Sequence, residues 1–266
     1  MSPLLIQNSD GKSIHSVDDW FDLAPPKRGR RQWEDGRSAK ELAKAWFRTE
    51  RAKIPEELEA LFKSHASTKD LVIETAVPEK QTILDGFGGE PRNNDLILIG
   101  KAGGAPVVVG IEGKADEPFG PIIQEYLKEK ISTKSKVPDR IKLLLQSVFG
   151  RPIDENLGRL RYQLLHGLAG TIIETKRQGA SQAIFVVHEF ISEKTKPERV
   201  EQNKIDFERF IHSLPGFQTY IISPGILMGP LRVRGAEFVP NDIPVLIGKV
   251  TTNLRKKSVN FSFEKG

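Results

Sequence analysis

The chain of 266 residues contains no cysteine. Without thiols it cannot form disulfides, thiolate zinc sites or cysteine-ligated iron–sulfur clusters, and it cannot use a cysteine nucleophile. Histidine is scarce too: the five histidines are scattered, and no two stand four residues apart as they do in a helical metal site. Any bound metal is therefore expected to be a hard, oxygen-bound cation, Mg²⁺ or Mn²⁺.

Long apolar runs are also missing, since none approaches the roughly 18 residues that a membrane span needs. The first ten residues lack the basic region and the apolar stretch of a signal peptide. We therefore expect a cytoplasmic protein with no membrane contact. Hydrophobic residues make up 38% of the chain and charged residues 28%, as in a globular protein. The net charge of +5 favours polyanionic partners, although many other proteins share such an excess.

The N-terminal part predicts an irregular segment followed by two helices. Over 1–35, prolines and the basic cluster 27–31 interrupt any regular element, and we expect that cluster to be a solvated, flexible arm, with phosphate binding as the alternative. A helix is expected from Ser38, which would serve as its N-cap and form a capping box with Glu41. Pro55 is expected to open a second helix.

The middle of the chain predicts strands and then helices. Strands are expected at 71–77, 95–100 and 107–112, and the glycine-rich stretch 101–106 predicts a hairpin between the last two. Helices near 120–131, 138–149 and 156–176 should follow. The expected order then continues with a strand at 182–187, a helix near 200–213, and strands at 217–222, 231–233 and 243–247. This order indicates one mixed α/β sheet flanked by helices.

We divide the chain into three parts. Residues 1–68 are expected to form an arm and a helical extension, and residues 69–225 an α/β core. Residues 226–266 are expected to form a β extension packed on that core. No internal repeat suggests any other division.

A candidate site follows from the alternation of side chains in strands. In the segment 111–116, Glu112, Lys114 and Asp116 fall on one face. Asp95 begins the first strand of the hairpin, so strand pairing can bring its carboxylate beside Glu112. Two carboxylates can hold a divalent ion that lowers the pKa of a bound water, and a nearby lysine can position that water or stabilise developing charge. Phosphodiester hydrolysis needs this mixture.

The pattern Asn94-Asp95, a hairpin and then Glu112-Gly113-Lys114 resembles the PD-(D/E)XK nucleases. The resemblance implies a restriction-endonuclease-like core with Asp95 and Glu112 as metal ligands. It also implies that Gly113 lends its main-chain carbonyl and that Lys114 acts on the attacking water.

The same family often carries a glutamine on the helix after the Glu-x-Lys strand, and Gln163 is the candidate for it. Gln163, Gly167, Gly170 and Glu174 fall on one stripe of a helix. The two glycines should let this helix approach the sheet closely and bring Gln163 toward the metal. The resemblance covers roughly residues 70–190.

Some positions depart from the family pattern. Asn94 stands where the family often has proline, and Gly167 stands where it often has tyrosine. Some members add a helical glutamate before the first strand, for which Glu41 and Glu57 are possible equivalents.

Several other side chains were considered for a role. Arg159 and Arg161 are candidates for contacts with a nucleic-acid backbone, because their helix should border the active face. Asp116 and Glu117 are expected to be solvated loop acids. His188 ends an apolar strand and is expected to be a structural histidine.

The expected function is metal-dependent hydrolysis of phosphodiester bonds in nucleic acid, with DNA as the expected substrate and a homodimer left open. One alternative is a non-catalytic nucleic-acid- or protein-binding module that keeps the nuclease-like fold. A second is an unrelated α/β domain in which Glu112 and Lys114 form an exposed ion pair and Asp95 merely ends a turn.

Overall fold

The protein is described here by a computed structural model that covers residues 4–255. A seven-stranded mixed sheet runs through it in the order β1-β2-β3-β4-β5-β7-β6. The strands are β1 (Leu5–Ile6), β2 (Val72–Thr82), β3 (Arg92–Ala102), β4 (Ala105–Lys114), β5 (Gln182–Ile191), β6 (Met228–Leu231) and β7 (Val245–Asn253). The prediction of a mixed α/β sheet flanked by helices is confirmed.

Strands β2, β3 and β4 form an antiparallel meander, whereas β4, β5 and β7 are parallel to one another. The hairpin between β3 and β4 turns at Gly103 and Gly104, which have φ angles of 56° and 81°. Glycine adopts such positive φ angles readily, and a two-residue turn of this kind matches the twist of the paired strands. The glycine-rich stretch therefore produces the expected hairpin.

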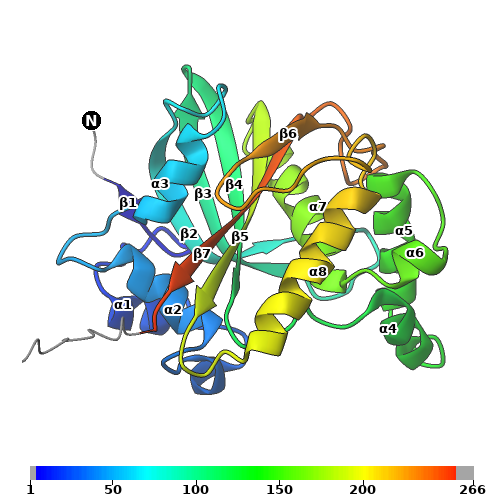
Figure 1. Cartoon of the computed structure of the whole chain (residues 1–266), viewed down its shortest axis with the longest axis horizontal. Coiled ribbons are helices and arrows are strands. Elements are labelled where there is room, and N and C mark those ends of the chain that lie inside the picture. Colours follow the sequence, from blue (N-terminus) through cyan, green and yellow to red (C-terminus); the bar gives the residue numbers. More distant parts are fainter. Residues whose placement is uncertain (1–3, 256–266) are drawn as a thin grey trace, which may run out of the picture.

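Helices cover both faces of the sheet (Figure 1). One face carries α1 (Val17–Leu23), α2 (Ser38–Trp46) and α3 (Glu56–Lys63). The other carries α4 (Ile123–Lys130), α5 (Val137–Phe149), α6 (Glu155–Gly158), α7 (Tyr162–Arg177) and α8 (Pro197–Ser213). A 3₁₀ helix, η1 (Gly29–Gln32), lies between α1 and α2.

The two faces bury separate cores because side chains alternate along the strands. Ile184 and Val186 of β5 join the core with α1 to α3, whereas Phe185 and Val187 of the same strand join the core with α4 to α8. All four side chains are buried. Polar groups at the C-terminal ends of β4 and β5 are therefore held between two packed layers.

The prediction of a strand at 217–222 is wrong, since this segment consists of turns and irregular backbone. Gly216 breaks the chain direction with a φ of 81°, and Phe217 is buried in the core without joining the sheet. Phe217 also stacks on Tyr220, with ring centroids 4.6 Å apart. The apolar residue Phe217 therefore serves core packing and does not mark a strand.

Two other segments differ from expectation. The helix expected over 156–176 is divided into α6 and α7 by a short break. The segment 1–35, expected to be irregular, contains β1, α1 and η1. The side chain of Asn8 fixes this segment: its Oδ1 accepts from the main-chain N–H groups of Asp10 and Lys12, and its Nδ2 donates to the carbonyl of Leu23. Hydrophobic periodicity does not register such polar contacts.

The three expected parts of the chain share one sheet. Strand β1 from the first part pairs with β2, and β7 from the third part pairs with β5. Of the helices within residues 4–255, none has the length and apolar character needed to cross a membrane.

Candidate active site

The structure brings Asp95, Glu112 and Lys114 together. The β3–β4 register pairs Leu96 with Ile111, so Asp95 and Glu112 follow at the next opposed position. The Oδ2 atom of Asp95 accepts a hydrogen bond from the main-chain N–H of Gly113, at 2.7 Å. Lys114 Nζ donates to Glu112 Oε1 at 2.6 Å.

Glu112 lies at the centre of a buried charge cluster. Its side chain is 2% exposed, and its second oxygen accepts a hydrogen bond from Arg92 Nη2 at 2.7 Å. Burial alone would raise the pKa of Glu112, but the charges of Lys114 and Arg92 hold that pKa below its usual value. Burial would lower the pKa of Lys114, but Glu112 and Asp95 raise it. Both groups are therefore ionised at neutral pH.

Asp95 titrates very differently from Glu112. Burial, and then the negative charge of Glu112, raise the pKa of Asp95 to about 7. The N–H of Gly113 and the nearby cations act in the opposite direction but do not cancel these effects. Two adjacent carboxylates in a buried place repel each other, and a bound cation would relieve that repulsion.

A further carboxylate, Glu79 of β2, lies at the same place. Burial, and then the charge of Asp95, raise the pKa of Glu79 to about 8. The φ angle of Glu79 is 51°, in the left-handed region that non-glycine residues rarely adopt. Its Oε2 accepts a hydrogen bond from Asn93 Nδ2 at 3.3 Å. Such backbone strain clusters at functional sites.

No sequence pattern pointed to Glu79. The predicted strand ends at residue 77, before Pro78, and so leaves Glu79 outside it. In the structure β2 continues: Pro78 pairs with Leu96 and Lys80 with Asn94, and Glu79, with its positive φ, lies between them. Pro78, a proline inside a long strand, was the sequence feature that could have indicated an unusual backbone position here.

The donor atoms at this place suit a hard cation. Within residues 4–255, no three acidic or histidine side chains form a ready-made metal site. Mg²⁺ needs fewer protein ligands than that, because it keeps several waters and takes oxygens from its substrate. Asp95, Glu112 and the carbonyl of Gly113 can supply such a partial set. Each carboxylate oxygen of Glu112 has a lone pair beyond its present hydrogen bond.

Helix α7 packs closely on this site, as its glycine stripe predicted. A Cβ atom on Gly167 would stand 2.8 Å from Cζ of Phe185, and one on Gly170 would stand 2.9 Å from Cδ of Arg92. Only glycine therefore allows the helix to lie at this distance from the sheet. Gln163, in the first turn of α7, faces the same cavity as Asp95.

Arg92 and His166 complete the cluster, and no sequence pattern predicted either of them. Arg92 Nη1 contacts His166 Nδ1, and Arg92 Nε donates to Asn94 Oδ1 at 2.9 Å. Burial, and then the charge of Arg92, lower the pKa of His166 well below its usual value. The neutral imidazole is thus an acceptor that orients Arg92 toward Glu112.

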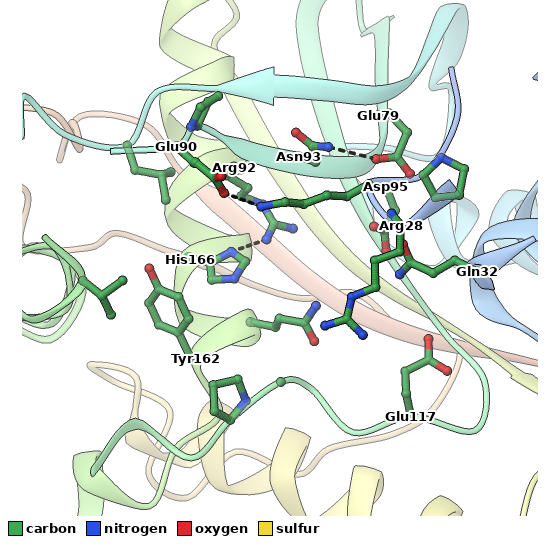
Figure 2. Close-up of a pocket in the computed structure, with 18 of the residues that line it drawn as sticks. Arg28, Gln32, Glu79, Glu90, Arg92, Asn93, Asp95, Glu117, Tyr162 and His166 are labelled. Atoms are coloured by element: carbon green, nitrogen blue, oxygen red, sulfur yellow. Dashed lines mark hydrogen bonds and ion pairs between the residues drawn. The ribbon is translucent and has the colours of Figure 1, made fainter. Parts of the chain in front are cut away.

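A cavity of about 970 Å³ opens beside these residues (Figure 2). Asp95, Glu79, Gln163 and His166 line it, and Arg28 points into it. Its basic lining residues are Lys27, Arg28, Arg31, Arg37, Arg92, Lys136 and Arg140, and its acidic ones are Glu79, Glu90, Asp95 and Glu117. The excess of cations favours an anionic ligand.

Residues 13–254 match the family described as "Domain of unknown function (DUF6946)". The chain belongs to the DUF6946 family. No curated protein and no solved structure matches it.

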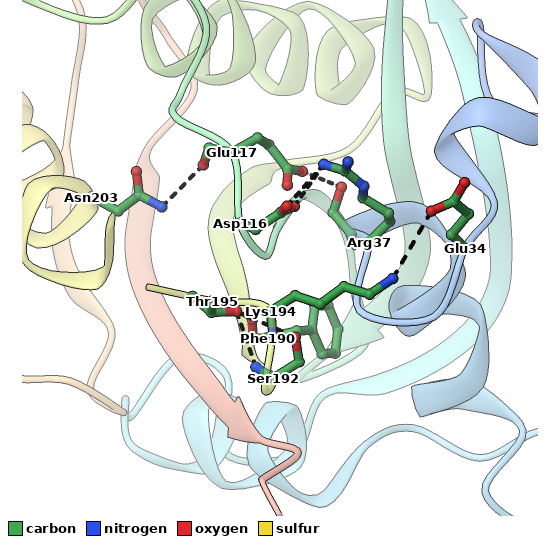
Figure 3. Close-up of polar contacts among 10 residues, drawn as sticks. Glu34, Arg37, Asp116, Glu117, Phe190, Ser192, Lys194, Thr195 and Asn203 are labelled. Carbon is green, nitrogen blue, oxygen red and sulfur yellow. Dashed lines mark hydrogen bonds and ion pairs between the residues drawn. The ribbon is translucent and has the colours of Figure 1, made fainter. Parts of the chain in front are cut away.

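The basic cluster 27–31 of this DUF6946 member differs from the expected flexible arm. It folds around η1, and Lys27, Arg28 and Arg31 line the cavity. These side chains are exposed, as expected of a solvated segment, but the sequence does not show the cavity that they line. The adjoining residue Arg37 fixes the segment through its Nη1, which lies 2.9 Å from Asp116 Oδ2 (Figure 3).

The predicted capping box at Ser38 is wrong. The N-cap of α2 is Arg37, and the hydroxyl of Ser38 binds the carboxylate of Glu117 instead. Glu41 accepts from the main-chain N–H of Gly36, at 2.8 Å. The Ser38 hydroxyl is thus bound to Glu117, which is distant in sequence, and does not cap the helix as the local pattern predicted. Asp116 and Glu117, expected to be solvated acids, anchor this segment.

The two arginines predicted to hold nucleic acid are not among the residues that line the cavity. Arg159 forms an exposed ion pair with Glu155. Arg161 Nε donates to Asp206 Oδ2 at 2.6 Å, and its Nη1 donates to the carbonyl of Gly120 at 3.1 Å. Their geometry indicates local ion pairing for Arg159 and a structural link for Arg161.

The possible helical glutamates also serve other contacts. Glu57 binds Arg48 and lies 3.2 Å from His188 Nε2, on a part of the protein that does not line the cavity. His188 is fully buried, and its Nε2 lies 2.8 Å from Thr252 Oγ1. These contacts fit the expected structural role of His188.

Proposed function

We propose that this protein is a Mg²⁺- or Mn²⁺-dependent nuclease with a restriction-endonuclease-like core, and that DNA is its substrate. One observation carries the proposal: Asp95, Glu112 and Lys114, predicted from the sequence, meet beside a cavity with a basic lining. The antiparallel meander β2–β3–β4, followed by α7 and the parallel strand β5, also supports it.

The residues would divide the chemistry as follows. Asp95, Glu112 and the Gly113 carbonyl would hold the cation, which would supply Lewis-acid stabilisation of the phosphate and lower the pKa of a bound water. Lys114 remains charged because Glu112 and Asp95 raise its pKa. Its ammonium group can orient the attacking water and stabilise negative charge that develops on the phosphate. Burial strengthens this electrostatic effect, because the surrounding protein is less polarisable than water.

Arg92 positions Glu112 in this scheme. Its guanidinium group reaches Glu112, Asn94 and His166 at once, so it fixes the carboxylate from the side opposite Lys114. A fixed carboxylate loses little freedom when the cation and substrate bind. Gln163, which lines the same cavity, can donate to or accept from a substrate group.

The alternative function is a non-catalytic module that binds nucleic acid or protein. The double ion pair of Glu112 favours it, because Lys114 and Arg92 already neutralise this carboxylate without a metal. The two functions predict different results when Mg²⁺ is added, since only a nuclease would cut the nucleic acid that it binds.

Cleavage of labelled single-stranded DNA and of supercoiled plasmid, in Mg²⁺, Mn²⁺ or EDTA, tests the proposal. We expect cleavage that EDTA abolishes and that Lys114→Ala reduces by a factor of at least about 100. Lys249→Ala is the matched control, because Lys249 Nζ also pairs with a buried carboxylate of this sheet, Glu189 Oε2 at 2.9 Å, but it pairs with neither Asp95 nor Glu112. Equal cleavage by Lys114→Ala and wild type would contradict the proposal.

A further inference from the structure

Five segments far apart in the sequence surround the cavity, and each contributes lining residues. They are 26–39, 84–93, 116–121, 126–140 and 162–166, and together we call them the ring. The ring joins the η1 segment to the connection between β2 and β3 and to the starts of α4, α5 and α7.

Polar contacts close one half of the ring. Lys27, beside η1, forms an ion pair with Glu90 of the β2–β3 connection. Arg140 of α5 donates from Nη1 to the carbonyl of Glu90 at 2.9 Å and also binds Asp85. The segments 26–39, 84–93 and 126–140 are therefore linked in that order.

Further contacts close the other half. Tyr126 of α4 packs on Tyr162 of α7, with ring centroids 5.4 Å apart. The main-chain N–H of Tyr162 donates to the carbonyl of Pro121 at 3.0 Å. Arg37 and Asp116 then connect this segment back to 26–39. The cavity beside Asp95 is thus encircled by contacts between segments.

The lining of the ring offers two kinds of binding group. Arg28, Arg31 and Lys136 have exposed side chains, and within residues 4–255 none of them has an ion-pair partner. Free cations of this kind bind phosphate groups. Tyr126 and Tyr162 line the same cavity with their rings tilted by 48° to each other. Tyr162 is largely buried, so the half-buried ring of Tyr126 is the one on which an unpaired base can stack.

A continuous duplex does not match this site. Its bases are stacked inside the helix, so their faces cannot reach aromatic rings unless a nucleotide leaves the stack. Moreover, about 970 Å³ is the scale of a pocket for a drug-sized ligand, which corresponds to a few nucleotide units. A single strand can enter an encircled cavity more readily than a double helix, which is much wider.

From these observations we propose that the ring accepts an unpaired nucleic-acid strand, such as a single-stranded end or overhang, and not a continuous duplex. This inference rests on the proposed nuclease function, because the strand would lead to Asp95. Arg28, Arg31 and Lys136 would hold phosphates, and Tyr126 would stack on a base.

The test measures binding without cleavage, in EDTA. Fluorescence anisotropy compares a labelled oligothymidylate of about 20 nucleotides with a blunt duplex of the same length. We expect the single strand to bind at least about tenfold more tightly than the duplex, with an affinity that falls as salt rises.

Paired variants locate the binding surface. We expect the double variant Arg28→Gln and Arg31→Gln to weaken single-strand binding by about tenfold and to reduce its salt dependence. The control is the double variant Lys176→Gln and Arg177→Gln, which also removes two positive charges. These residues lie at the C-terminal end of α7, whereas the cavity is lined by its N-terminal end, so binding should change by less than about twofold. Circular dichroism spectra confirm that all variants fold.

Several results would overturn the inference. Duplex binding that equals or exceeds single-strand binding would do so, and so would equal losses in the two double variants. Binding to neither DNA would also overturn it. In each case metal-dependent cleavage, measured separately with Lys114→Ala, still decides whether the proposed function stands.

Discussion

The carboxylate of Asp95 accepts a hydrogen bond from the main-chain N–H of Gly113, at 2.7 Å. This bond connects the two strands of the hairpin where their regular pairing ends, after Leu96 and Ile111. Asp95 is thereby fixed beside Glu112, and its negative charge is held close to that of Glu112. The stability of the protein should therefore depend on the ionisation of Asp95.

The first prediction concerns that dependence on pH. The folded-state pKa values of Asp95 and Glu79, about 7 and about 8, lie above those of unfolded chains. Between pH 4 and 8 the folded state thus binds more protons, and this contribution to stability is lost as pH rises through the folded pKa values. We compare the free energy of unfolding of Asp95→Asn with that of wild type. The value for Asp95→Asn minus the value for wild type should increase by about 1–3 kcal/mol from pH 5.5 to 8.5.

Urea unfolding in EDTA at several pH values measures this difference. Asp242→Asn is the control, because Lys176 lowers the pKa of the exposed Asp242 and leaves it ionised over the whole range. Its stability relative to wild type should stay constant. A constant difference for Asp95→Asn as well would show that Asp95 titrates normally.

The second prediction concerns Glu79 and metal affinity. Glu79 adds negative charge next to Asp95, so Glu79→Gln should weaken Mg²⁺ binding by roughly three- to tenfold. Isothermal titration calorimetry at pH 8.5 measures the affinity. Glu74→Gln is the control on the same strand, since Glu74 forms an exposed ion pair with Lys101. Unchanged Mg²⁺ affinity in Glu79→Gln would show that Glu79 does not contribute to the metal site.

The third prediction concerns the approach of α7 to the sheet. A methyl group on Gly167 would stand 2.8 Å from the ring of Phe185, which is buried in the core. We expect Gly167→Ala to destabilise the protein by about 1–3 kcal/mol through overpacking. Thermal and urea unfolding measure the change, with the exposed substitution Lys176→Ala on the same helix as control. Increased stability would mean that α7 does not lie this close.

The fourth prediction concerns Arg92. Its planar guanidinium reaches three partners, which a lysine ammonium cannot do in the same geometry. Arg92→Lys should therefore cost about 2–4 kcal/mol of stability. Arg48→Lys is the control, because Arg48 also binds a carboxylate, Glu57, but with its side chain 42% exposed. Its cost should stay below about 1 kcal/mol, and equal costs would contradict the assigned role of Arg92.

Local patterns predicted the part of the site that lies on one hairpin. The apolar strands, the glycine turn and the Asp95 and Glu112 positions are all close in sequence, so strand alternation and turn preference suffice to place them. The glycines of α7 were likewise readable from helical spacing, because their role is a packing distance along one helix face.

The remainder of the site depends on contacts between distant segments. Arg92 and His166 meet across 74 positions, and Lys27 and Glu90 across 63. No local pattern encodes such pairs. The strand assigned to 217–222 failed for a related reason: the apolar character of Phe217 serves packing against helices, which strand periodicity cannot distinguish from sheet pairing.

The central claim is that Asp95 belongs to a metal-dependent hydrolytic centre. The most direct measurement is the cleavage of one end-labelled DNA strand in Mg²⁺ by wild type, Asp95→Asn and Asp242→Asn. We expect wild type and Asp242→Asn to cleave at equal rates, and Asp95→Asn to be slower by a factor of at least about 100 while still binding the strand. Equal cleavage by all three proteins, or no cleavage by wild type, would contradict the account.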